Sequence, residues 1–359
     1  MKRNSFFNLD WSLIIPAMVL CFLSLTTLFS INISLFKSQL FFLIFSIIAF
    51  LFFSQINYQI LKFYAKPIYV ISIILLLIDL FIGLSARGSV RWVQLLGIRI
   101  QFSEILKPFL AISLSAFLAN RENYSLKTMS LIILFLLPIV YLIFRQPDLG
   151  NALIYIITCI LALIAFGFPL KFFLLGLGSV ALASPLIWNS MHAYQKERIF
   201  AFINPTDPLG SSYNTIQSII AIGSGMLFGK GLGQGTQSGL KFLPEMHTDF
   251  IFATFSEELG MIGTSILFLV FSYLLYRIYV IYINADETFT KIFAGIAFCL
   301  LLSQFFINIG MNLGILPIVG VTLPFISYGG SSLLSNFILL GLLSGISKRD
   351  NAKNVLEIK

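Results

Sequence analysis

Long apolar stretches, most of about 18 residues or more, recur along the whole chain and are separated by short polar segments. Stretches of that length are typical of helices that cross a lipid bilayer. The pattern predicts an all-α polytopic membrane protein with about ten spans, formed by a single domain over residues 1–359. We place the spans at about residues 12–31, 37–55, 66–84, 103–119, 128–144, 149–167, 170–188, 250–276, 291–311 and 323–346.

Two segments interrupt this pattern. Residues 85–103 are semi-polar and contain Trp92, which suits a membrane interface, so we expect a short re-entrant or interfacial piece. Residues 189–249 form the long polar stretch of the sequence and are rich in Gly, Pro, Asn and Ser. A segment of this kind is often functional. We expect it to form one large loop between the seventh and eighth spans.

Basic residues orient the chain, because Lys and Arg concentrate in cytoplasmic loops. With about ten spans, both termini lie in the cytoplasm and residues 189–249 lie on the outer face. Two explanations stay open for basic residues left outside: tolerance in loops, or binding of an anionic group such as a phosphate. The cytoplasmic set is Lys2, Arg3, Lys62, Lys66, Arg121, Lys127, Lys171, Arg277, Lys291, Lys348, Arg349 and Lys353, and the outer set is Arg87, Arg91, Arg99, Arg145, Lys196, Arg198, Lys230 and Lys241.

Composition agrees with a membrane protein and excludes an ordinary soluble domain. Hydrophobic residues make up 58% of the chain and charged residues 11%, and the mean hydropathy is +0.94. The net charge of +8 comes from basic residues in short loops. We therefore expect membrane lipid, and no nucleic acid, as its partner. The cysteines Cys21, Cys159 and Cys299 lie in apolar runs without metal-site spacing, so we expect them to pack in the core.

The glycine-rich run from Gly223 to Gly239 (GSGMLFGKGLGQGTQSG) could be taken for a phosphate-binding loop. A P-loop requires Gly five residues before its Gly-Lys pair, and Ser or Thr directly after the Lys. Ser224 and Gly231 occupy those two positions here, so the motif is not met. Two interpretations remain: a backbone that approaches a ligand or hinges, or a plain loop.

Acidic residues gather where the long polar segment becomes apolar. Glu245, His247 and Asp249 lie within five residues at this boundary. Asp249 could be a helix N-cap, or a general base whose carboxylate is tuned by partial burial. Metal binding by His247 with a carboxylate is a third possibility, although a single histidine disfavours a structural zinc site.

Several polar residues fall inside predicted spans, where charge is costly. Glu104 and Lys107 stand three residues apart on one helical face, so we expect them to pair. A stripe of amides with a four-residue spacing is more typical of contacts between helices than of a substrate site. The stripe is Gln304, Asn308 and Asn312, and the other intramembrane acids are Asp79, Glu257 and Glu258.

Four motifs, in this order along the chain, resemble the SEDS family of bacterial cell-wall proteins (RodA, FtsW and SpoVE). They are RGSVRWVQLLGIRIQFSEILKP (87–108), RQPDLGNAL (145–153), the segment 192–260 with its HTDFIFA motif, and NIGMNLGILPIVGVTLPFISYGGSS (308–332). Within the family, Asp10-Trp11 and residues 192–198 look more like the RodA branch.

The resemblance implies a ten-span glycosyltransferase that polymerises peptidoglycan glycan strands from lipid II together with a class B penicillin-binding protein, a transpeptidase. The family's essential aspartate corresponds to Asp249, and its Glu/Lys pair to Glu104 and Lys107. Asn151 and Met226 depart from the usual residues without touching the acidic ones. Asp148, Glu245 and His247 are further motif residues.

On this basis Asp249 is expected to act as general base in an inverting transfer that joins lipid II to undecaprenyl-pyrophosphate-linked glycan in the bacterial inner membrane. The candidates for binding the pyrophosphate are Arg87, Arg91, Arg145 and Lys230, with Mg²⁺ or Mn²⁺ as a possible aid. Two other functions stay open: a lipid II flippase or carrier, which would depend on Glu104, and a non-catalytic scaffold, which would tolerate loss of Asp249.

Overall fold

The computed structural model describes residues 9–86, 89–95, 98–121, 125–203, 212–240 and 242–357. Seven of the described helices are long and apolar enough to cross a membrane, and three shorter apolar helices coincide with the remaining predicted spans. The chain is thus a multi-pass, predominantly helical membrane protein, as the hydropathy pattern predicts. The seven are α1 (Trp11–Ile31), α2 (Ile33–Phe53), α4 (Ala65–Ile82), α7 (Leu126–Arg145), α13 (Ile251–Asn284), α14 (Thr288–Asn312) and the first part of α15 (Gly330–Glu357), and the shorter three are α6 (Lys107–Ala119), α8 (Leu149–Ala165) and the apolar part, Leu170–Leu186, of α9 (Leu170–Ser190).

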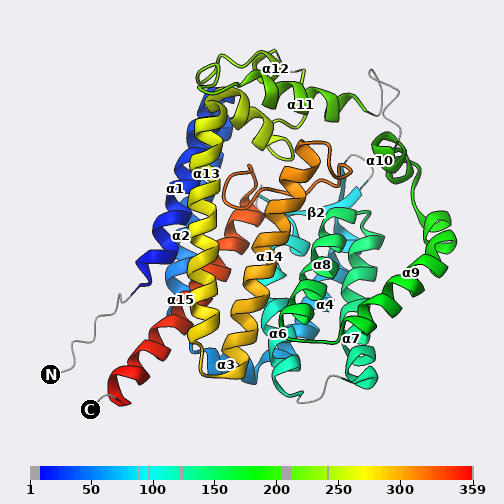
Figure 1. The fold of residues 1–359 in the computed structure, drawn as a ribbon, viewed down its shortest axis with the longest axis vertical. Helices are drawn as coiled ribbons and strands as arrows, with labels where there is room; N and C mark the ends of the chain where they lie inside the picture. Colours follow the sequence, from blue (N-terminus) through cyan, green and yellow to red (C-terminus); the bar gives the residue numbers. More distant parts are fainter. Residues whose placement is uncertain are drawn as a thin grey trace.

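Helix α14 is the centre of the bundle. It is buried along most of its length, and it packs against α6, α8 and α13. On the other side of α13, α1 and α2 pack together, and α2 also lies along α15 (Figure 1). Helix α9 stands apart from this bundle at the right of Figure 1, and its leucines are largely exposed. In a bilayer such an apolar surface faces lipid.

The semi-polar segment after α4, predicted to be a short re-entrant or interfacial piece, forms a small antiparallel sheet. Its strands are β1 (Leu84–Ala86), β2 (Ser89–Leu95) and β3 (Ile98–Ile100), in the order β1-β2-β3. Strand β2 contains two valines and a tryptophan, residue types that favour strands. The short helix α3 (Tyr58–Phe63) precedes α4, and the short helix α5 (Phe102–Ile105) follows β3.

Residues 189–249 connect α9 to α13, as predicted, and their described part is largely helical. It contains α10 (Ala193–Ile203), α11 (Tyr213–Ser224) and α12 (Thr236–Gly239). Figure 1 shows α11 and α12 over the end of the bundle opposite the chain termini. Helix α11 gains stability from packing against α13.

Candidate active site

Asp249 lies in a tight turn directly before α13, at the end of the bundle that α11 and α12 cover. Asp249 is half-buried. Phe250 occupies the N-cap position of α13, so the capping interpretation of Asp249 is wrong. The turn needs unusual backbone geometry, because Glu245 has a φ of +53°.

Two side-chain amides of α14 hold the backbone of Asp249. Asn308 and Asn312 each donate from Nδ2 to its carbonyl oxygen, at 3.1 and 3.0 Å. Asn308 also donates to the carbonyl of Val321, at 2.7 Å. The stripe of amides therefore joins the Asp249 turn to the segment that follows α14.

That following segment, residues 313–329, packs directly against the turn. Ser327 donates its hydroxyl to the carbonyl of Thr248 at 2.7 Å, and the Tyr328 N–H donates to the carbonyl of His247 at 2.9 Å. Gly320 has a φ of +72°, and a Cβ added there would lie 3.4 Å from Asp249 Oδ2. A glycine at this position thus satisfies the backbone conformation and lets the chain approach the carboxylate.

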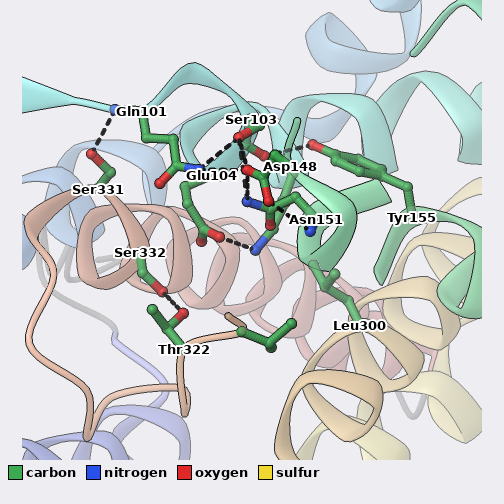
Figure 2. Close-up of polar contacts among 12 residues, drawn as sticks. Gln101, Ser103, Glu104, Asp148, Asn151, Tyr155, Leu300, Thr322, Ser331 and Ser332 are labelled. Atoms are coloured by element: carbon green, nitrogen blue, oxygen red, sulfur yellow. Dashed lines mark hydrogen bonds and ion pairs between the residues drawn. The ribbon is translucent and has the colours of Figure 1, made fainter. Parts of the chain in front are cut away.

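A second polar centre surrounds Asp148, the N-cap of α8 (Figure 2). Its carboxylate is buried and accepts hydrogen bonds from Gln101 Nε2 at 2.7 Å and Asn151 Nδ2 at 2.9 Å. The backbone N–H of Gln101 donates to Ser331 Oγ at 3.0 Å. Asp148 is a fully engaged acceptor that connects α8 to the start of α5 and, through Gln101, to α15.

Glu104 and Lys107 meet as their spacing predicts. Lys107 Nζ lies 2.7 Å from Glu104 Oε1, and both side chains are buried beside the Asp148 centre (Figure 2). Because each charge would be costly alone in this apolar setting, their mutual pairing explains why both are present.

The glycine-rich run approaches the backbone of a helix. Helix α13 is broken at Gly260, whose φ and ψ are 64° and −162°. The break leaves backbone groups of α13 without helical partners, and residues 226–231 bind them. The hydrogen bonds are Met261 N–H to Met226 O (2.9 Å), Ile262 N–H to Leu227 O (3.1 Å), Lys230 N–H to Glu257 O (2.9 Å) and Gly231 N–H to Glu258 O (3.0 Å).

Side chains reinforce this attachment. The buried Glu257 carboxylate accepts backbone N–H groups of Gln237 and Ser238 at 2.9 and 3.0 Å. Lys230 Nζ lies 2.6 Å from Thr236 Oγ1 and 3.4 Å from Glu257 Oε1. Lys230 thus holds the glycine-rich run against α13, and its contact with pyrophosphate stays a prediction.

The structure says less about the other residues predicted to bind pyrophosphate. Arg145 ends α7 with an exposed side chain, whereas Arg87 and the side chain of Arg91 lie outside the described residues. Arg198 was not among the pyrophosphate candidates, yet its Nη1 donates to the carbonyl of Ile318 at 3.3 Å, two residues before Gly320. The sequence could have indicated Arg198 because it is one of the basic residues predicted on the outer side.

No group of three or more His, Cys, Asp and Glu side chains in the described ranges is arranged to hold a metal ion. A Mg²⁺ or Mn²⁺ carried by the substrate's phosphates would need only one or two protein carboxylates. Asp249 and Glu245 are the acidic residues of the turn, so metal dependence stays a prediction.

A family model described as "Cell cycle protein" (FTSW_RODA_SPOVE) matches residues 4–352. The chain belongs to the FtsW/RodA/SpoVE family. It is 40% identical to the peptidoglycan glycosyltransferase MrdB of Escherichia coli K12 over 300 residues, which are 82% of this chain and 80% of that protein. It is 36% identical to stage V sporulation protein E of Bacillus subtilis over 319 residues, 87% of this chain and 86% of that one.

Solved structures of the FtsW/RodA/SpoVE type agree with this fold. The rod shape-determining protein RodA of Thermus thermophilus aligns with a TM-score of 0.73 at 26% identity, covering 95% of this chain and 97% of that one. A chain from a structure titled "Structural coordination of polymerization and crosslinking by a peptidoglycan synthase complex" aligns with a TM-score of 0.83 at 26% identity, covering 96% and 99%.

Proposed function

We propose that this chain is a peptidoglycan glycosyltransferase that polymerises lipid II into β-1,4 glycan strands during cell elongation, with Asp249 as general base. The observation that carries the assignment of the base is the placement of Asp249. Its residue is half-buried at the end of the bundle, and Asn308 and Asn312 fix its backbone. A carboxylate held in this way is preorganised for proton transfer at the depth where a lipid-linked sugar meets the membrane surface.

In the proposed reaction the Asp249 carboxylate takes the proton of the GlcNAc 4-hydroxyl of lipid II. The oxygen then forms a bond to C1 of the MurNAc at the reducing end of the growing strand. The bond from C1 to the pyrophosphate breaks, and undecaprenyl pyrophosphate leaves with the electron pair. One displacement inverts the anomeric centre from α to β, so no covalent enzyme intermediate is needed.

Cations at this end of the bundle neutralise the leaving group in the proposal. The candidates remain Arg87, Arg91, Arg145 and Lys230, and the contact of Arg198 with Ile318 adds Arg198 to them. Mg²⁺ or Mn²⁺ bound to the pyrophosphate would supply further positive charge there.

The proposed setting is the bacterial inner membrane, with both termini in the cytoplasm and the Asp249 end outside. The proposed partner is a class B penicillin-binding protein, which cross-links the strands. The support for a partner is the likeness to a chain of a peptidoglycan synthase complex.

The test uses the purified full chain with its transpeptidase partner and lipid II, and measures glycan polymer by gel. Replacing Asp249→Asn removes the base while keeping the shape, so we expect polymerisation to fall about 10²–10⁴-fold. Glu287→Gln is the matched control, since Glu287 pairs with Lys62 at the opposite end of the molecule. Retained polymerisation in Asp249→Asn would refute the base.

The carrier alternative makes a different prediction for the same assay. A carrier makes no glycan polymer, so lipid II supplied in detergent would stay unpolymerised with the unaltered chain, with Asp249→Asn and with Glu104→Gln alike. Loss of polymer only in the Asp249 variant supports the enzyme.

A further inference from the structure

A second cavity lies at the end of the bundle that carries the chain termini, far from Asp249. It occupies about 570 Å³ between the last residues of α6, α8 and α13 and the first turn of α14. A volume of this order suits a small molecule or a lipid headgroup with part of its glycerol backbone, and exceeds the size of a free phosphate. Lining residues include Leu118, Arg121, Phe166, Phe168, Asp286 and Lys291.

The mouth of this cavity is charged and its wall is apolar. Arg121, Asp286 and Lys291 are exposed, whereas Leu118 and Phe168 are buried. Such a lining is complementary to an amphiphile that has a polar head and an apolar body.

The two cations at the mouth are held by aromatic rings instead of carboxylates. The Arg121 guanidinium lies 5.1 Å from the ring centre of Phe117, and Lys291 Nζ lies 5.5 Å from that of Tyr282. Neither cation forms an ion pair within the described part of the chain. Lys62, at the same end of the molecule, is instead neutralised by Glu287 at 2.6 Å. The cavity therefore presents two positive charges against one negative charge, that of Asp286.

The depth of the cavity agrees with the level of phospholipid headgroups. Three helices end and one begins around it, and helix ends of a spanning bundle lie at the edge of the hydrocarbon layer. Basic pockets between spanning helices at this level bind the phosphates of anionic lipids.

We propose that this cavity is a binding site for the phosphodiester headgroup of an anionic phospholipid in the leaflet at the terminus-bearing face. Arg121 and Lys291 bind the phosphate. The wall formed by Leu118 and Phe168 contacts the glycerol backbone and the first methylene groups, and the Asp286 carboxylate accepts a hydrogen bond from a headgroup hydroxyl. The site is separate from Asp249 and does not depend on the proposed reaction.

The test is native mass spectrometry of the purified full chain titrated with phosphatidylglycerol or phosphatidylcholine. We expect one phosphatidylglycerol to bind more tightly than the rest. The double substitution Arg121→Gln with Lys291→Gln should weaken that binding roughly 30-fold. The matched control, Lys66→Gln with Lys127→Gln, removes two exposed lysines outside the cavity and should leave the affinity within about twofold.

A second variant keeps every charge and fills the space. Ala165 is exposed and lines the cavity, so Ala165→Trp should weaken phosphatidylglycerol binding at least tenfold without unfolding the bundle, as checked by thermal unfolding without added lipid. Displacement of the lipid by inorganic phosphate at low millimolar concentration would identify a free anion as the ligand and would overturn the phospholipid assignment. Equal affinity for both lipids, or equal phosphatidylglycerol affinity in all variants, would overturn the site.

Discussion

At the scale of single residues, the three side-chain amides on one face of α14 have two different roles. Asn308 and Asn312 use their amides to hold the carbonyl of Asp249, and Asn312 Oδ1 also accepts the N–H of Ala253 at 3.2 Å. Gln304, one turn before Asn308, is equally buried, but its amide atoms have no hydrogen-bond partner in the described part of the chain. A side-chain amide thus anchors the candidate base at two positions and only fills space at the third.

This contrast gives a paired prediction. Asn312→Leu removes hydrogen bonds to Asp249 and Ala253, although the Asp249 carbonyl keeps its bond from Asn308 and the Ala253 N–H keeps the carbonyl of Phe250, so the cost is about 1–3 kcal/mol in unfolding free energy. We expect a lower unfolding temperature and at least a tenfold loss of polymerisation. Gln304→Leu should be neutral or slightly stabilising in thermal unfolding, because it removes an unsatisfied buried amide. Equal losses in both variants would show that the amides act by volume alone.

At the scale of elements, the decisive feature is the set of hydrogen bonds between the glycine-rich run and the backbone of α13 at its break. Glycine is required where backbones touch: a Cβ at Gly225 would overlap the carbonyl of Ser256, and one at Gly229 would overlap that of Glu258. The carboxylates of Glu257 and Glu258 then tie the rest of the run to the helix, Glu258 through Ser30 and the N–H of Gly233. These contacts attach the run firmly to α13.

We predict that Glu257→Gln loosens this attachment. The substitution removes the charge that Lys230 and the backbone N–H groups of Gln237 and Ser238 face, so it should cost about 1–3 kcal/mol. Hydrogen exchange across residues 230–240 should accelerate, and the unfolding temperature should fall. Glu287→Gln breaks a half-exposed ion pair with Lys62 and should cost at most about 1 kcal/mol. Unchanged exchange in Glu257→Gln would contradict the role assigned to this carboxylate.

At the scale of the whole molecule, the termini and the Asp249 turn lie at opposite ends of the bundle (Figure 1). The proposed phosphate cavity shares the end of the termini, and α11 and α12 share the end of Asp249. The two proposed sites therefore lie at opposite ends of the bundle.

This arrangement predicts which substituted positions meet water on each side. The native cysteines are buried, so labelling of the unaltered chain should be weak. In intact cells a membrane-impermeant maleimide should label Leu240→Cys, near α12, and should label Thr288→Cys only after permeabilisation. The same labelling pattern for both positions would contradict the orientation.

The sequence predicts the spans well because hydropathy over about 18 residues is a local property. It also predicts the pairing of Glu104 with Lys107, since the helix itself brings positions three apart together. It does not predict that Gln101 reaches Asp148, or that Asn308 reaches Asp249, because those contacts join residues 47 and 59 positions apart. Helices α11 and α12 were missed for a related reason, as their stability comes from packing on α13 rather than from their own composition.

The bonds between residues 226–231 and the break in α13 also constrain how the protein is made. The chain leaves the ribosome from its N-terminus, so residues 226–231 are synthesised before Met261 and Ile262. Until the run docks back, the new helix enters the membrane with unpaired backbone groups, which hydrocarbon does not tolerate. Biogenesis therefore includes a docking step between two sequential segments. A bulky residue at Gly229 is expected to reduce the amount of inserted protein that escapes proteolysis, before any effect on turnover can be measured.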